Sequence, residues 1–256
     1  MNLYRVSTIG RVFFLLFFLW SCGPSQKPVY VEGSLISVDS LQAPVIDFKI
    51  DSVIGFYREA LEDEMKEVLA YSAQTMTRGT PEGLLNNFIA DLCLEIGRDL
   101  YLPDDGHHID FALFNYGGLR ASIRQGPITK ANIFELMPFE NEMVVITLSP
   151  EKTLELFDYI AEAAVGMPVS GIRIIIDDNE VKDVRIGADI FDPSRSYKVL
   201  TSDYLAGGGD NMTFFLDPIN SELLGMRIRD AIILHLQHQH DAGKEIMSSL
   251  DGRISH

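Results

Sequence analysis

The stretch IDFALFNYGGLR, residues 109–120, sets the expectation for the fold. It begins as a short apolar strand over residues 109–114 and ends in two adjacent glycines followed by Arg120. Glycine has no Cβ, so a ligand can approach its main chain closely. In α/β sheets the loops at the carboxyl ends of strands line the ligand crevice. This pattern therefore predicts a ligand site at the end of a strand.

A second glycine cluster stands in TSDYLAGGGDNMTFF, residues 201–215, again after an expected strand. Neither cluster has the spacing of a phosphate loop or of a dinucleotide-binding turn, and structural turns alone would account for glycines. Each cluster, however, ends in a charged side chain. Arg120 suits an anion or a carbonyl-rich ring, and Asp210 suits a pair of hydroxyl groups.

The rest of the chain alternates between helical and extended patterns. Four-residue spacing of apolar side chains and capping residues predict helices over residues 51–75, 80–97, 149–164 and 221–238. Short apolar runs predict strands over residues 109–114, 143–148, 172–177, 181–186 and 197–201, with a hairpin turn at Asp177-Asp178-Asn179. We expect a single mixed α/β domain whose mixed sheet is flanked by helices.

Composition limits the possible partners. Of the 256 residues, 46% are hydrophobic and 23% are charged, which is typical of a globular protein with one sizeable core. The formal net charge of −16 disfavours nucleic acid as a ligand, and an anion needs a local cluster of arginines or backbone N–H groups. With one cysteine, Cys93, beyond residue 22, no disulfide framework is expected, and Cys93 is interpreted as buried packing.

The first residues have the pattern of an export signal. Two arginines precede an apolar run from Val12 to Trp20, too short to span a bilayer comfortably. The segment Leu19-Trp20-Ser21-Cys22 resembles a bacterial lipobox, which implies lipidation of Cys22 and anchoring at the cell envelope, in the periplasm or at the surface; an ordinary signal peptide with a leftover thiol is the alternative. The predicted organisation is a signal over 1–21, a tether over 22–44, a domain over 45–245 and a polar tail over 246–256.

Five blocks then make a family resemblance. Residues 115–120, NYGGLR, resemble the N-G-G-G-I-R block of the C-terminal domain of 5′-nucleotidases. GPIT at 126–129 with MPFEN at 137–141 resembles G-P-I-T…L-P-F-G-N, and LNNFIAD at 85–91 is similar to L-G-N-L-I-A-D. VSGIR at 169–173 and YLAGGGD at 204–210 resemble V-S-G-L-R and F-L-A-x-G-G-D. The blocks follow the family's order.

The resemblance implies a nucleotide pocket. Phe139 and Tyr204 would stack on the base, unless Phe139 is a core residue and Tyr204 a plain strand aromatic. Asp210 would accept hydrogen bonds from the ribose hydroxyls. The other implied contacts are Asn115 and Asn141 to base or sugar edges, Arg120 to a phosphate or sugar oxygen, and the backbone of Gly117, Gly118 and Gly171.

Four positions depart from the family pattern, because Asn86, Tyr116, Glu140 and Asn211 each stand where the family has glycine. Glu140 would place negative charge beside Phe139 and disfavour a nearby phosphate unless Arg120 or a partner compensates. Recognition of a nucleoside is therefore an alternative to recognition of a nucleoside monophosphate.

The resemblance also implies a phosphoesterase domain with two metal ions, whose motifs this sequence does not show. We expect no catalytic residue, metal site or cofactor in this chain, with divalent metal ions held by a separately encoded metallophosphoesterase partner. The histidines His235, His238 and His240 are interpreted as a solvated helix end, and His107-His108 as an exposed loop. Two alternatives stay open: a lipid-anchored nucleoside- or nucleotide-binding protein without a hydrolytic partner, and a degenerate interaction scaffold.

Overall fold

The computed structural model describes residue 33 and residues 48–163 and 165–255. The expected signal peptide, Cys22 and nearly all of the tether lie outside these residues. Contacts divide the chain into two compact units, Met1–Ser52 and Val53–His256. Helix α2, Phe48–Met65, crosses that boundary and buries none of its residues. No helix among the described residues is long and apolar enough to cross a bilayer.

The helix expected over residues 51–75 is wrong beyond Met65. Residues Val68–Ser72 form strand β1, which pairs antiparallel with β3, Gly126–Thr129. Leu69, which the helical spacing grouped with the residues of α2, is buried in this strand. Pairing with a segment about sixty residues away outweighs a local helical period, because strand formation depends on cross-strand partners.

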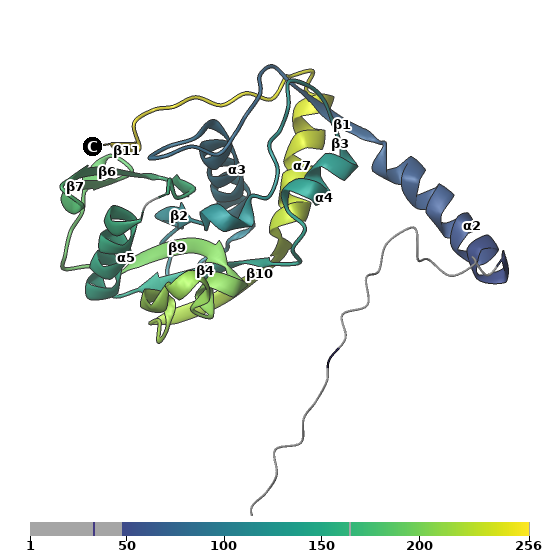
Figure 1. Cartoon of the computed structure of the whole chain (residues 1–256). Coiled ribbons are helices and arrows are strands. Elements are labelled where there is room, and N and C mark those ends of the chain that lie inside the picture. Colours follow the sequence, from purple (N-terminus) through teal and green to yellow (C-terminus); the bar gives the residue numbers. More distant parts are fainter. Residues whose placement is uncertain (1–32, 34–47, 164, 256) are drawn as a thin grey trace, which may run out of the picture. The chain divides into compact units, whose positions relative to one another are not determined.

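A mixed five-stranded sheet lies at the centre of the second unit (Figure 1). Its strand order is β10-β4-β9-β2-β5, and only the β2–β9 pair is parallel. The strands are β2 Phe111–Leu113, β4 Glu142–Leu148, β5 Val169–Ser170, β9 Tyr197–Ser202 and β10 Asn220–Arg227. The expected mixed α/β fold with helices flanking the sheet is confirmed.

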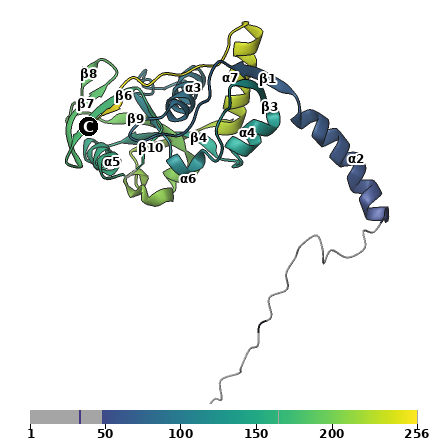
Figure 2. The ribbon, with the colours of Figure 1, turned by 45° about the horizontal axis from the view of Figure 1, so that its top comes forward.

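Both faces of this sheet are buried, and neighbouring strand residues enter different cores. Ala112 and Phe114 pack into a core with α3 (Leu84–Leu100) and α7 (Ile228–Asp241). Phe111 and Leu113 enter a second core with α5 (Pro150–Glu162). Figure 2 shows α3 and α5 on different sides of β9. A strand buried on both faces reads as a continuous apolar run, which is why it was recognisable from the sequence.

A smaller four-stranded sheet has the order β11-β6-β7-β8. The predicted hairpin is confirmed as β6 (Ile172–Asp177) paired with β7 (Glu180–Ile186), and Asp178 and Asn179 take the positive φ that such a turn requires. β8 is Asp189–Ile190, and β11, Ile254–Ser255, runs parallel to β6. The C-terminal residues expected as a polar tail therefore pack onto the domain, with Ile246 and Ile254 buried.

Three other boundaries differ from the prediction. The helix expected from residue 221 begins only at Ile228, because residues 220–227 form strand β10 against β4. Helix α3 begins at Leu84 and continues through Gly97, whose missing side chain leaves room for the side chain of Leu200. The short helical elements not predicted are α4 (Lys130–Leu136), α6 (Asp203–Ala206) and the 3-10 turns η2 (Tyr116–Gly118), η3 (Gly209–Asn211) and η4 (Thr213–Phe215).

Candidate functional site

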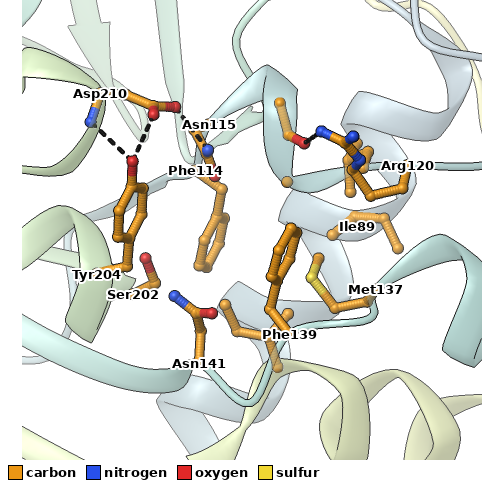
Figure 3. A pocket seen from close by; sticks show the side chains of 14 residues that line it. Ile89, Phe114, Asn115, Arg120, Met137, Phe139, Asn141, Ser202, Tyr204 and Asp210 are labelled. Carbon is orange, nitrogen blue, oxygen red and sulfur yellow. Dashed lines mark hydrogen bonds between the residues drawn. The ribbon is translucent and has the colours of Figure 1, made fainter. Parts of the chain in front are cut away.

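A cavity of about 330 Å³ opens at one edge of the central sheet (Figure 3). Strands β2 and β9 are parallel neighbours, so the loops that follow them meet at this edge. Strand β4 is antiparallel to β9, so residues 137–141, which precede it, arrive at the same place. The lining residues are Ile89, Phe114, Asn115, Gly117, Gly118, Leu119, Arg120, Met137, Phe139, Asn141, Ser202, Tyr204, Asp210 and Ile228.

The cavity brings together eight of the nine positions predicted as substrate contacts. Gly171 is the exception, because it does not line this cavity. It lies at the β5–β6 junction with φ of +81°, and a Cβ there would meet the carbonyl oxygen of Asp110 and the side chain of Leu94. Backbone conformation and close packing against the sheet account for this glycine.

Two aromatic rings flank the cavity (Figure 3). Phe139 is 42% exposed and Tyr204 is 48% exposed, so neither ring is a core residue. Tyr204 lies in the short helix α6 after β9, not on a strand. Rings that keep about half of their surface open beside a cavity are available to stack on a planar ligand.

A carboxylate and its donors form the polar end of the cavity. Asp210 accepts a hydrogen bond of 2.8 Å from the Tyr204 hydroxyl and one of 2.6 Å from the Asn115 side-chain amide (Figure 3). The Tyr159 hydroxyl donates to the backbone carbonyl of Asp210 at 2.9 Å. The hydrogen bond to Asp210 raises the pKa of Tyr204, because the proton is held between oxygens. The two donors set the orientation of a carboxylate that retains further acceptor positions.

Glycines beside these side chains leave them the space they occupy. A Cβ on Gly118 would lie 2.7 Å from the Asn115 side-chain oxygen. A Cβ on Gly209 would lie 2.5 Å from two ring atoms of Tyr204. Both distances are far below van der Waals contact, so a larger residue would displace the side chain beside it.

Glu140 does not leave an uncompensated negative charge beside Phe139. Its carboxylate pairs with Arg229 and, at 2.9 Å, with Arg227. The hydrogen bond from Arg229 holds the pKa of Glu140 below its usual value. The expected obstacle to a phosphate near Phe139 is therefore removed by two arginines that the sequence interpretation had not assigned.

Arg120 and Arg78, unlike Arg227 and Arg229, donate to backbone carbonyls of the loop after β2. Arg120 lines the cavity, and its Nη1 donates to the Gly117 carbonyl at 3.5 Å. Arg78, which sequence reasoning missed, lies 4.4 Å from the Tyr116 ring centroid and donates to the Tyr116 carbonyl at 3.2 Å. Tyr116 thus packs beneath an arginine instead of entering the cavity.

The remaining departures from the family pattern have structural explanations. Asn86 is buried and hydrogen-bonds with the backbone of Gly79 and Gly166. Asn211 has φ of +61°, a conformation that asparagine tolerates better than most residues, and it does not line the cavity. Neither residue changes the shape of the site.

Most of the cavity-lining residues that were not predicted from the sequence are apolar. Ile89, Phe114, Met137 and Ile228 line the cavity beside the polar groups. Ile89 lies in the helix predicted over residues 80–97, and the spacing of apolar residues does not indicate which of them border a cavity.

No group of three or more metal-ligating side chains is placed to hold an ion within the part of the chain that the structure describes. His235 packs on the Phe88 ring and lies 3.8 Å from Glu95, and burial lowers the pKa of His235. This position is more buried than the solvated helix end that was expected. His107 and His108 are exposed, as predicted.

Comparison with known proteins places these features in context. The model of the family described as "5'-nucleotidase, C-terminal domain" matches residues 62–217. Apyrase from Tabanus yao is 24% identical over 244 residues, which cover 84% of this chain and 43% of the apyrase. Protein UshA from Escherichia coli K12 is 31% identical over 108 residues, 40% of this chain and 19% of UshA. The chain thus spans less than half the length of these relatives.

Solved structures of nucleotidases also match this chain over less than half of their own length. The 5′-nucleotidase precursor from Thermus thermophilus superposes with a TM-score of 0.66 at 26% identity, over 82% of this chain and 43% of that protein. The NAD nucleotidase from Haemophilus influenzae shares the fold, with a TM-score of 0.58 at 17% identity, over 81% of this chain and 41% of that protein.

Proposed function

The chain belongs to the family of 5′-nucleotidase C-terminal domains, and from this premise we propose that its cavity recognises the nucleoside part of a nucleotide. The observation that carries the proposal is the pair of half-exposed rings, Phe139 and Tyr204, on a cavity of about 330 Å³. Stacking on an aromatic ring contributes about 1–3 kcal/mol per base. A cavity with two such rings favours a planar heterocycle over a flexible aliphatic ligand.

The polar end of the cavity supports the sugar assignment. The Asp210 carboxylate is oriented by Tyr204 and Asn115, and a carboxylate accepts hydrogen bonds from adjacent hydroxyl groups such as a ribose diol. Arg120 lines the same cavity and carries the charge needed near a phosphate or a sugar oxygen. In this arrangement the base lies between the rings and the ribose lies toward Asp210.

We further propose that a dimetal metallophosphoesterase on a separate chain cleaves the phosphate ester while this chain holds the nucleoside. This proposal divides recognition and hydrolysis between two chains, and it rests on the match of this chain to the C-terminal domain of 5′-nucleotidases. This chain would contribute proximity and orientation, and the partner's divalent metal ions would supply the hydroxide and stabilise the phosphate charge. The lipobox-like segment before Cys22 supports anchoring of the pair at the envelope membrane.

Binding is tested by calorimetric titration of the full chain with adenosine, adenosine monophosphate and ribose 5-phosphate. Tyr204→Ala and Phe139→Ala are each expected to weaken adenosine binding by roughly 5- to 150-fold, which corresponds to about 1–3 kcal/mol of stacking. Tyr57→Ala, which removes an exposed ring from α2, is the matched control and should bind as the wild type does. Equal affinity of all four proteins for adenosine would contradict base recognition and favour the scaffold alternative.

Hydrolysis is tested by measuring phosphate release from adenosine monophosphate with Mg²⁺ or Mn²⁺ present. The chain alone should release none, and a co-purifying metallophosphoesterase should gain activity toward nucleotides when the chain is added. Hydrolysis of adenosine monophosphate by the isolated chain would contradict the two-chain proposal. Adenosine binding without any gain in partner activity would favour a binding protein with no hydrolytic role.

A further inference from the structure

Arg229 is a nearly buried arginine that holds the segment carrying Phe139. Its side chain is 5% exposed at the start of α7. One guanidinium nitrogen donates to the carbonyl oxygens of Met137 at 3.4 Å and Phe139 at 3.3 Å, and the other pairs with Glu140. A single side chain thus contacts three residues of a four-residue stretch, with the planar geometry that suits several acceptors at once.

The residues before Arg229 extend the same contact. Arg227 pairs with the second oxygen of Glu140 at 2.9 Å, and the backbone N–H of Ile228 donates to the Asn141 carbonyl at 3.0 Å. The Arg229 guanidinium also lies 4.2 Å from the Phe134 ring centroid, which fixes its own position. Three successive residues therefore dock the loop that supplies one side of the cavity.

Met137 at the start of this loop is buried in the core, whereas Phe139 is not. The loop lies between the end of α4 and the start of β4, so Phe139 belongs to neither a helix nor a strand. The Phe139 ring is 42% exposed, so packing covers only part of it. A ring held by little packing needs its backbone to be held for a stacking surface to be preformed. The ion pairs of Glu140, together with the hydrogen bonds from Arg229 to the Met137 and Phe139 carbonyls, supply that restraint in this chain.

We propose that Arg227 and Arg229, acting through Glu140, are positioning residues that hold Phe139 as a stacking wall of the cavity; this inference rests on the proposed nucleoside recognition. The Tyr204 wall is held by different groups, Asp210 and the adjacent glycine run. Breaking the Arg227–Glu140–Arg229 cluster should therefore loosen one wall and leave the other in place.

The test combines a reporter of the ring with a binding assay. Phe139→Trp, in a background where the chain's single tryptophan is removed by Trp20→Phe, places one indole at the wall. Its time-resolved fluorescence anisotropy is measured in the full chain without ligand, with and without Glu140→Gln. Arg227→Gln serves as a second, milder variant because Arg227 is 48% exposed. Glu180→Gln, which breaks the exposed pair with Lys182 on β7, is the matched control.

Faster and wider motion of the indole is expected with Glu140→Gln and with Arg227→Gln, and none with Glu180→Gln. In the chain with Phe139 intact, the first two changes should weaken adenosine binding by about 2- to 5-fold, the upper part of the range for a partly exposed charged pair. Unchanged anisotropy and unchanged adenosine affinity in both cluster variants, with the wild type binding adenosine, would overturn the inference and leave the proposed function standing. Absence of adenosine binding in the wild type would overturn the proposed function, while the anisotropy alone still decides whether the cluster holds the ring.

Discussion

Replacing Gly209 by alanine should damage the Tyr204 wall without touching any ligand directly. The new Cβ would lie 2.5 Å from two ring carbons of Tyr204 and 2.7 Å from its carbonyl oxygen. Ordinary contact begins at 3.4 Å, so the ring must retreat by about 0.9 Å (3.4 − 2.5 Å), and the backbone must also shift because ring movement does not relieve the contact with the carbonyl oxygen. Since Tyr204 is about half exposed, the ring has solvent to retreat into.

Two quantities follow from this displacement. If one stacked wall is lost, adenosine binding weakens by about 1–3 kcal/mol, or roughly 5- to 150-fold. Overpacking that the ring movement relieves only in part costs about 1 kcal/mol, which lowers the melting temperature by about 2–4 °C in a domain of this size. Gly207→Ala is the matched control, because its Cβ would lie 3.5 Å from its nearest neighbours, an ordinary contact.

The assay is calorimetric titration with adenosine, accompanied by thermal unfolding of the wild type and both variants. Gly209→Ala should show a large loss of adenosine affinity with a small loss of stability. Gly207→Ala should change neither the affinity nor the stability. A folded Gly209→Ala protein that binds adenosine as tightly as the wild type would refute the role of Tyr204 as a stacking wall. Equal losses in both glycine variants would show that the loop as a whole, not the ring clearance, controls binding.

Three further outcomes test other parts of the structure. Arg253→Met removes the two-pronged pair with Asp91 that fastens the C-terminal strand, and should lower the free energy of unfolding by about 1–3 kcal/mol, measured from the urea midpoint. Arg229 holds the pKa of Glu140 below its ordinary value of about 4.5, so the charged carboxylate stabilises the fold above that pH, and the contribution is lost as pH falls through the lower folded value. The wild type should therefore lose more stability on acidification than Glu140→Gln, measured by thermal unfolding across the pH range. Burial raises the pKa of the Cys93 thiol, so a Cys22→Ser chain should show no reaction with a thiol reagent near pH 8 until it is denatured.

The parts of the fold that the sequence predicted correctly are those whose burial is locally encoded. Strands β2 and β4 are largely apolar runs, and the β6–β7 hairpin has a turn whose residues accept positive φ. The segments predicted wrongly, β1 and β10, depend on partners far along the chain. β10 pairs with β4 about eighty residues away, and its positions alternate between exposed and half-buried with none fully buried, so the strand has no strong local signal.

The site was predicted from motif blocks, which explains both why eight of the nine positions lie together and why Gly171 lies elsewhere. The blocks around Asn115, Phe139 and Tyr204 meet because three strand ends share one edge of the sheet. Gly171 instead takes a positive φ, which the junction between β5 and β6 requires. A motif indicates that glycine is required at a position. Only the three-dimensional structure distinguishes a glycine required for ligand contact from one required for a left-handed backbone conformation.

The glycine run after β9 shows how this distinction alters the interpretation of the site. None of Gly207, Gly208 and Gly209 lines the cavity, although the sequence suggested a backbone open to a ligand. Gly207 donates its N–H to the Asp203 carbonyl to close α6, and Gly208 takes φ of +84°, which favours glycine. Gly209 leaves room for the Tyr204 ring, and the turn then presents Asp210 to that ring's hydroxyl. The three glycines therefore affect a ligand through the side chains of Tyr204 and Asp210. Substitutions of these glycines should change ligand affinity in proportion to how far they displace those two side chains, and not through the loss of backbone contacts with the ligand.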